Sequence, residues 1–305
     1  MSLQGLLQAG TRPVITAELP SIDGGGLAKV RDRLEAIAPY VDAVNATDNP
    51  AAHAHASNVA IAIAMQQAGV EPIMQVVCRD KNRIAIQADI VGASMFGVRN
   101  VCALTGVDVT AGDEPEARRV FDLDGPQVIS VATGLAQGHY MSGRKIDPAP
   151  DLFVGAVENP FAPPIPYRVE RAKTKSDAGA RFLQLQIGYH PDRLEDFVAG
   201  CVANGVTKRT ALLPTLVLVK RAGALRFMDR EVPGISVPEA VIDRVANAAD
   251  EAEAAYQHTL EQARHALSLP GVSGLHLTDF RHDGSLGRLV DELGVRDSHA
   301  KRDAS

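Results

Sequence analysis

The sequence predicts an α/β protein, a single (β/α)8 TIM barrel formed by residues 1–305. Eight short apolar runs alternate with helix-like stretches along the chain. Because each run is apolar throughout, both faces of its strand should be buried, as in a parallel sheet covered by helices. Eight such units within roughly 290 residues fit a barrel better than a six-stranded doubly wound sheet. No linker divides the chain, so one domain with a short disordered C-terminal tail at 298–305 is expected.

The predicted strands are apolar runs rich in Val, Ile, Leu and Ala. They are 14–20, 42–47, 72–78, 100–106, 152–158, 181–187, 210–218 and 274–280. Each is separated from the next by a segment long enough for a helix, which a crossover between parallel strands requires. Residues 108–150 are less regular than the rest and contain a basic loop around Arg144 and Lys145.

The predicted helices carry apolar residues three and four positions apart. Leu27, Val30 and Leu34, for example, lie on one face of residues 26–40. Asp80 or Asn82 would cap a helix that runs to about residue 96. The remaining helices are 57–68, 127–137, 168–178, 191–204, a long Ala- and Glu-rich helix at 238–267, and 285–293.

The composition excludes several classes of protein. A net charge of −6 argues against nucleic acid or an anionic membrane as the main partner. The three cysteines are scattered without a CxxC pair, which is typical of a reducing cytosol rather than of disulfides or structural zinc. Neither a signal peptide nor an apolar run approaching ~18 residues is evident, so we expect a cytoplasmic protein that spans no membrane.

Polar side chains gather at the ends of the predicted strands, where a barrel of this kind holds its active site. The strand ends carry Glu18, Asn45, Thr47, Gln75, Thr105, Gly106, Glu158, Asn159, Gln186 and Asp279. Most are uncharged hydrogen-bonding groups, which suit a flat polar heterocycle recognised by its amide and carbonyl edges. A divalent metal would need several His or carboxylate ligands close together, so no metal site is expected. For any one of these residues, bonding to the local backbone is the alternative.

Glu18 ends the first predicted strand and is the candidate catalytic residue. A charge at the end of a buried strand is costly unless it has a function. Burial should raise the pKa of the Glu18 carboxyl, so that this group can donate a proton near neutral pH. The alternative is a salt bridge to an Arg or Lys in a loop.

Seven segments, taken in order, resemble the methylenetetrahydrofolate reductase family in its short bacterial form without a regulatory domain. The segments are TAELPS at 16–21, DAVNATDN at 42–49, QVVCRDKNR at 75–83, GVRNVCALTG at 97–106, GAVENP at 155–160, KSDAGARFLQLQ at 175–186 and LHLTDF at 275–280. The resemblance covers about residues 12 to 295. It depends on the order and spacing of the segments, since no single one is specific.

This resemblance implies an enzyme of one-carbon metabolism and methionine biosynthesis. It implies a barrel that binds FAD at the carboxyl ends of its strands and reduces 5,10-methylenetetrahydrofolate with NAD(P)H as electron source. Glu18 matches the general acid of the family, and Gln186 matches the glutamine that binds the folate and the nicotinamide in turn. The cofactor contacts that the resemblance implies are Asn45, Thr47, Gln75, Thr105, Gly106, Asn159, Ala162, Arg171 and Lys175.

The sequence departs from the family pattern at two places. The loop after the fourth strand usually reads Thr/Arg-Gly-Asp, but here Val107 follows Gly106 and the aspartate is Asp108, which becomes the implied pterin contact. The usual His-Pro-Glu after the fifth strand is replaced by residues 159–161, Asn-Pro-Phe. These departures leave open a flavin-free barrel that passes hydride directly from nicotinamide to folate.

A non-catalytic pterin- or flavin-binding partner subunit is a further alternative. A pterin-dependent methyltransferase ranks last, because nothing indicates a corrinoid partner. The choice between NADH and NADPH stays open. So does self-association into a homo-oligomer, which is common for such barrels.

Overall fold

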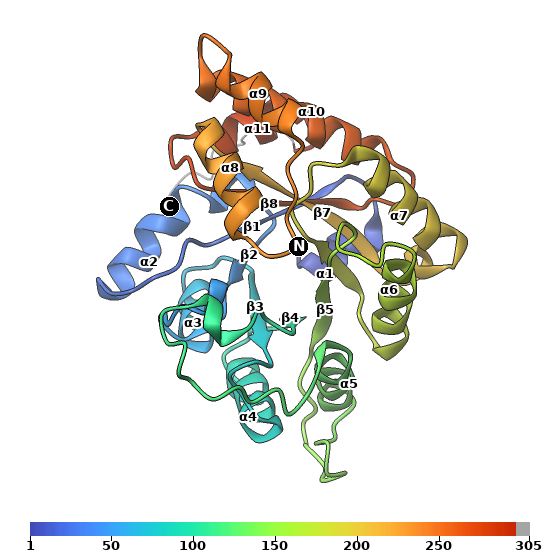
Figure 1. The fold of residues 1–305 in the computed structure, drawn as a ribbon. Helices are drawn as coiled ribbons and strands as arrows, with labels where there is room; N and C mark the ends of the chain where they lie inside the picture. The colour runs from blue at the N-terminus through green and yellow to red at the C-terminus, as the bar shows by residue number, and fades with distance from the viewer. Residues whose placement is uncertain (297–305) are drawn as a thin grey trace.

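Eight parallel strands close into a barrel in the computed structural model, which describes residues 1–296 (Figure 1). The strands pair in sequence order and β8 pairs with β1, so the predicted fold class is confirmed. The predicted tail at 298–305 lies outside the described residues. The strands are β1 Val14–Glu18, β2 Ala43–Ala46, β3 Pro72–Val77, β4 Asn100–Leu104, β5 Phe153–Glu158, β6 Phe182–Leu185, β7 Ala211–Leu218 and β8 Gly274–Asp279.

Helices surround the barrel in the described part of the chain (Figure 1). They are α1 Leu3–Ala9, α2 Gly26–Glu35, α3 Asn58–Gln67, α4 Arg83–Ser94, α5 Gly125–Ala136, α6 Tyr167–Ala178, α7 Pro191–Ala203, α8 Ala222–Glu231, α9 Glu239–Ala246, α10 Glu251–Ser268 and α11 Ser285–Leu293. None of the described helices is long and apolar enough to cross a membrane.

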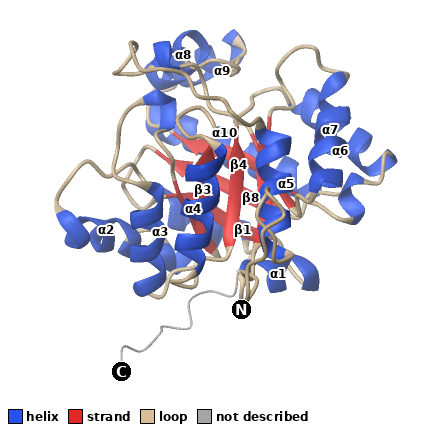
Figure 2. Cartoon of the chain, turned by 90° about the horizontal axis from the view of Figure 1, so that it is seen from below, coloured by secondary structure: helices blue, strands red, loops and turns tan. Residues whose placement is uncertain are grey.

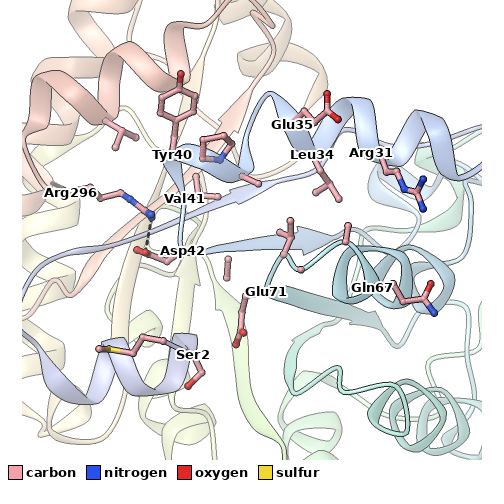
Figure 3. Close-up of a pocket in the computed structure, with 18 of the residues that line it drawn as sticks. Ser2, Arg31, Leu34, Glu35, Tyr40, Val41, Asp42, Gln67, Glu71 and Arg296 are labelled. Atoms are coloured by element: carbon pink, nitrogen blue, oxygen red, sulfur yellow. Dashed lines mark hydrogen bonds and ion pairs between the residues drawn. The ribbon is translucent and has the colours of Figure 1, made fainter. Parts of the chain in front are cut away.

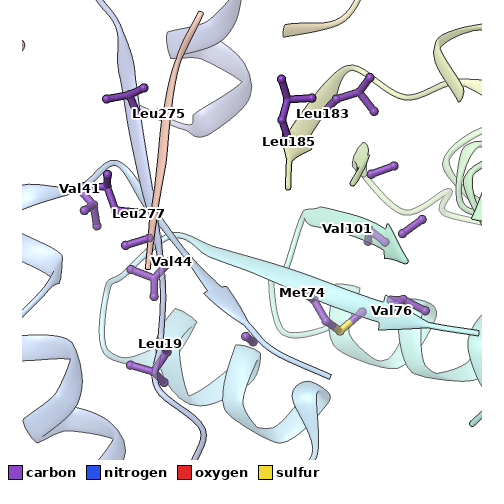
Figure 4. Packing of buried hydrophobic residues seen from close by; sticks show 14 of the residues in the cluster. Leu19, Val41, Val44, Met74, Val76, Val101, Leu183, Leu185, Leu275 and Leu277 are labelled. Carbon is purple, nitrogen blue, oxygen red and sulfur yellow. The ribbon is translucent and has the colours of Figure 1, made fainter. Parts of the chain in front are cut away.

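The two faces of each strand belong to different apolar clusters, because successive side chains of a strand point to opposite sides. The outward side chains pack against the helices in one large cluster, part of which Figure 4 shows. Its strand members include Val44, Met74, Val76, Val101, Leu183, Leu185, Leu275 and Leu277. Inward side chains such as Val14, Ile73 and Phe182 form a second cluster inside the barrel. Several inward side chains nearer the carboxyl ends are polar, among them Gln75, Gln184 and His276, which places the candidate site at that end.

Helix α1 covers the opposite end of the barrel, and the sequence analysis did not predict it. Ser2 caps this helix by accepting a hydrogen bond from the Gly5 amide at 3.2 Å. Leu3 and Leu6 pack against the inward side chains at the amino ends of the strands. Figure 2 shows α1 at one end of the strands and α8 and α9 near the other.

Two predicted helices divide differently in the structure. Residues 26–40 form α2 and then a separate 3-10 helix, Ala38–Tyr40, which has a proline near its start. The predicted helix at 238–267 is two helices, α9 and α10, because Asp250 caps a new helix by accepting from the Glu253 amide. Helix α8 was not predicted. Asn82, and not Asp80, caps α4.

Gly155 on β5 is expected to tolerate no side chain, since a Cβ atom there would lie 2.3 Å from Cζ of Phe182. The Phe182 ring is buried beside Phe153, so it has little room to move. We expect Gly155→Ala to lower the free energy of unfolding by about 1–3 kcal/mol, as overpacking does. Urea titration measures the change.

The control for this prediction is Gly92→Ala in α4, where a Cβ atom meets nothing within 4 Å. That change should be neutral or stabilising by up to ~1 kcal/mol, because alanine is the better helix former. Equal stability of Gly155→Ala and the unchanged protein would contradict the packing argument.

Candidate active site

Glu18 lies at the mouth of the barrel, at the carboxyl end of β1. The hydroxyl of Thr278 on β8 donates to Glu18 Oε2 at 3.2 Å, and Nε2 of Gln75 on β3 donates to Oε1 at 3.4 Å. Nε2 of His276 on β8 lies 4.0 Å from Oε1. The ion pairs of the described residues give Glu18 no Arg or Lys partner, so the salt-bridge alternative is not observed. The side chain is 31% exposed and therefore open to a ligand.

The surroundings of Glu18 correct the expected direction of its pKa. Burial acts to raise the pKa of this carboxyl, as the sequence analysis assumed. The nearby His276 ring, together with the hydrogen bonds that Thr278 and Gln75 donate, outweighs burial and leaves the pKa lowered. Glu18 is therefore ionised near neutral pH in the ligand-free protein. The direction of the Glu18 pKa could not be predicted from the sequence, because the donors that lower it lie on other strands.

A buried polar layer lies directly beneath Glu18, and the sequence analysis missed its central residues. Gln184 on β6 and Asn45 on β2 exchange two amide hydrogen bonds, of 2.8 and 3.0 Å. Gln184 Nε2 also lies 3.2 Å from Nδ1 of His276, which in turn is 2.8 Å from the Thr16 hydroxyl. The alternation in LHLTD and FLQLQ was the available signal, since it places His276 and Gln184 on the inward faces of their strands.

Gln186, the predicted substrate residue, does not join this layer. It follows β6, and its side-chain oxygen accepts a hydrogen bond from the Ile187 amide at 2.9 Å. It lines a separate cavity of about 280 Å³ together with Tyr189 and His258. No hydrogen bond between Gln186 and Glu18 occurs among the described residues. Any joint action of the two on a ligand depends on that ligand spanning the distance between them.

The residues predicted in the loop after β4 lie in two different environments. Thr105 and Gly106 are exposed at the strand end. Gly106 has a φ of +87°, and a Cβ atom there would lie 2.9 Å from Val77 Cγ1, so the turn favours glycine. Asp108 instead accepts from Arg119 Nε at 2.5 Å and from the Thr110 hydroxyl at 2.7 Å. Arg119 holds the pKa of this carboxyl well below its usual range. Asp108 is exposed and engaged, away from Glu18.

The two cations predicted on α6 surround an acid rather than an open site. Lys175 Nζ donates to Glu158 Oε2 at 2.5 Å, and the Lys175 residue is 5% exposed. Arg171 Nε and Arg168 Nη1 each lie 3.6 Å from the same carboxylate. Burial, together with these arginines, lowers the pKa of Lys175 although Glu158 acts to raise it. Glu158 therefore points outward from the barrel, toward α6.

The other predicted cofactor residues lie in loops at the barrel mouth. Asn159 donates from Nδ2 to the Gly234 carbonyl at 3.0 Å. The Ala162 carbonyl accepts from Arg168 Nε at 2.7 Å. Thr47 is partly buried just after β2. Of all the predicted site residues, only Glu18 and Gln75 are joined by a direct hydrogen bond among the described residues.

A pocket of about 1260 Å³ lies at the other end of the barrel (Figure 3). Its lining includes Asp42 and Glu71, which precede β2 and β3, and Asp42 pairs with Arg296 at 2.6 Å. Active sites of such barrels lie at the carboxyl ends of the strands. The pocket is therefore not the candidate active site.

Comparison with protein families gives a match to the family model described as methylenetetrahydrofolate reductase, over residues 25–294. A Caenorhabditis elegans protein described as probable methylenetetrahydrofolate reductase (NADPH) is 21% identical over 237 residues, which cover 74% of this chain and 33% of the relative. Methylenetetrahydrofolate reductase 2 of Schizosaccharomyces pombe is 23% identical over 240 residues, 73% of this chain and 35% of the relative. The chain thus spans about a third of the length of these relatives.

Two solved structures share the fold. A Clostridium thermocellum protein described as binding two copies of 5-methyl-5,6,7,8-tetrahydrofolic acid has a TM-score of 0.65 at 13% identity, and covers 96% of this chain and 99% of its own. EDTA monooxygenase from Chelativorans sp. BNC1 has a TM-score of 0.56 at 11% identity, and covers 95% of this chain and 96% of its own. Identities this low support the barrel architecture alone.

Proposed function

Because this chain belongs to the methylenetetrahydrofolate reductase family, we propose that it reduces 5,10-methylenetetrahydrofolate to 5-methyltetrahydrofolate. The hydride originates from NADH or NADPH. The observation that carries the proposal is the Glu18 carboxylate, which is accessible at the barrel mouth. It is held by donors from β3 and β8 and has no Lys or Arg partner within residues 1–296.

The reaction needs one proton and one hydride. The bridging methylene joins N5 and N10 of the folate and is a poor hydride acceptor. Protonation of N10 breaks the bond from N10 to the methylene carbon and leaves an iminium cation at N5. Hydride then adds to that carbon and gives the N5-methyl group. Glu18 supplies the proton to N10, and the carboxylate that remains stabilises the cation.

The lowered pKa of Glu18 sets a condition on this mechanism. The carboxylate is ionised when the mouth is open to water. A bound folate displaces that water, and loss of solvation favours the protonated form. Substrate binding and proton uptake by Glu18 are therefore coupled. Glu18 takes up its proton when the substrate binds, so the free enzyme need not hold this carboxyl in the protonated form.

The family resemblance implies FAD, but the side chains that would hold it are engaged elsewhere. Lys175 is buried against the Glu158 carboxylate, and Arg171 lies 3.6 Å from the same group. Asn45 is bonded to Gln184, and Asp108 to Arg119. These contacts speak against FAD held as the resemblance implies, so no step is assigned to a flavin. They support the alternative that nicotinamide passes its hydride directly to the iminium carbon.

We expect freshly purified protein to be colourless and to oxidise NADH or NADPH only when the folate substrate is present. The visible absorption spectrum and the folate-dependent rate, measured on the same preparation, test this. A flavin band that NAD(P)H bleaches and folate restores would assign the hydride to the flavin route. No folate-dependent oxidation with either nucleotide, with or without added FAD, would contradict the function and favour a non-catalytic partner subunit.

A further inference from the structure

Four side chains form a continuous chain of contacts across the barrel interior, directly below Glu18. In order they are Asn45, Gln184, His276 and Thr16, which come from β2, β6, β8 and β1. His276 is 3% exposed and the other three are buried at least as deeply. We call these four residues the interior chain. A buried network of this kind fixes the orientation of its members when every donor meets an acceptor.

The interior chain determines which nitrogen of His276 carries a proton. Gln184 Oε1 accepts from Asn45 Nδ2, and the Cys102 thiol donates to the same oxygen at 3.6 Å. Burial raises the pKa of the Cys102 thiol, so it stays protonated and able to donate. With its oxygen fixed in this way, the Gln184 amide nitrogen is the group that faces Nδ1 of His276, at 3.2 Å. An amide nitrogen only donates, so Nδ1 must accept.

A histidine that accepts at Nδ1 is neutral and carries its proton on Nε2. In His276 that nitrogen is the one 4.0 Å from Glu18 Oε1. We propose that His276 is a positioning residue that the interior chain locks as the Nε2–H tautomer, with this N–H directed at the Glu18 carboxylate. The catalytic role given to His276 rests on the proposed function. The tautomer does not, because it is a property of the ligand-free protein.

This arrangement gives His276 a defined effect on Glu18. The titratable groups that face Glu18 among the described residues are His276 on β8 and, one layer deeper, the Cys102 thiol on β4. The remaining contacts, Gln75 on β3 and Thr278 on β8, are neutral donors. His276 therefore holds the carboxylate ionised until substrate displaces water. Its removal should make Glu18 take up a proton at higher pH.

The first test is the tautomer itself, read by nitrogen NMR of the whole protein labelled with ¹⁵N-histidine. His276→Gln identifies the His276 signals by their loss. We expect the nitrogen shifts of a ring whose Nε2 carries the proton and whose Nδ1 accepts a hydrogen bond. A ring protonated at Nδ1, or at both nitrogens, would overturn the proposal whether or not the protein reduces folate.

The second test compares His276→Gln with His276→Leu. Glutamine places an amide nitrogen at the same distance from Cβ as Nε2 of histidine, whereas leucine has no donor. Carbon NMR of ¹³C-glutamate-labelled protein gives the midpoint for Glu18, assigned through Glu18→Gln. We expect the midpoint to rise by up to about one pH unit in His276→Leu, since a hydrogen bond to a charged group sets the upper limit for an N–H that lies 4.0 Å from the carboxylate. It should rise less in His276→Gln.

Activity adds a readout that a purely structural role would not change. Because Glu18 acts as an acid, the fall of kcat/KM at high pH should move upward with the Glu18 midpoint in His276→Leu. Equal midpoints for Glu18 in both variants and in the unchanged protein would overturn the proposal. If His276→Leu does not fold, the tautomer read by nitrogen NMR in the unchanged protein decides the matter. If the Glu18 midpoint shifts as expected but the protein does not reduce folate, the result contradicts the proposed function and leaves the role of His276 intact.

Discussion

Replacing Glu18 by glutamine is expected to lower the rate of folate reduction by about 10²- to 10⁴-fold, the range attributed to a positioned acid. The amide keeps the shape of the side chain: its oxygen can still accept from Gln75, and its nitrogen can donate to the Thr278 hydroxyl, so the fold should be unchanged. It cannot carry a transferable proton, and it has no charge to stabilise the iminium cation. Folate-dependent oxidation of NAD(P)H measures the loss, and thermal unfolding checks the fold.

The matched control for this prediction is Glu114→Gln, an exposed carboxylate removed in the same way. It should leave both the rate and the stability unchanged. If the protein proves to hold a flavin, Glu18→Gln should retain that flavin and still oxidise NADH with an artificial acceptor. Folate turnover by Glu18→Gln at a rate close to that of the unchanged protein would remove Glu18 from the mechanism.

Replacing Lys175 by methionine is expected to lower the free energy of unfolding by about 3 kcal/mol. Removing one partner of a buried ion pair costs ~3–5 kcal/mol, because the other charge is left without compensation. Arg168 and Arg171 remain 3.6 Å from Glu158, so we place the cost at the lower end of that range. Urea titration measures the loss. The double variant Lys175→Met, Glu158→Leu should recover part of it, since the buried carboxylate is removed as well, although Arg168 and Arg171 then lose this partner.

Lys173→Met is the control on the same helix. Lys173 is an exposed partner of Asp177, four positions along α6, and such pairs contribute ~0.5 kcal/mol or less. The comparison also tests the role that the resemblance gave to Lys175. Unchanged stability of Lys175→Met, together with weaker binding of FAD or NAD(P)H, would show a cofactor contact instead of a structural ion pair.

The sequence predicted most of the fold because helix and strand periods are local. The run at 72–78, for example, is apolar at nearly every position, and only a strand covered on both faces accommodates that pattern. Local patterns did not predict helix α1 or the break between α9 and α10. The short helix α1 offered few apolar contacts of its own, and the pattern of α9 and α10 continued across the cap at Asp250 without a Gly or Pro to mark the break.

Local sequence patterns likewise predicted only part of the candidate site. Glu18 was identifiable because an acid at the end of an apolar run is rare and its position at the barrel mouth follows from the fold class. The partners of Glu18 were not identifiable, because Thr278 is 260 positions away and is brought near only by closure of the barrel. The resemblance implied that Lys175 contacts the cofactor, and the structure places it against Glu158.

The sequence by itself therefore determined a parallel barrel with one acid at its mouth, since both follow from patterns of a few neighbouring residues. The tertiary structure alone decided whether that acid is charged and which groups face it. The pKa of a carboxyl depends on the donors, charges and solvent around it, and at Glu18 the donors come from two other strands, β3 and β8. The pKa of Glu18 therefore cannot be predicted from a short stretch of sequence.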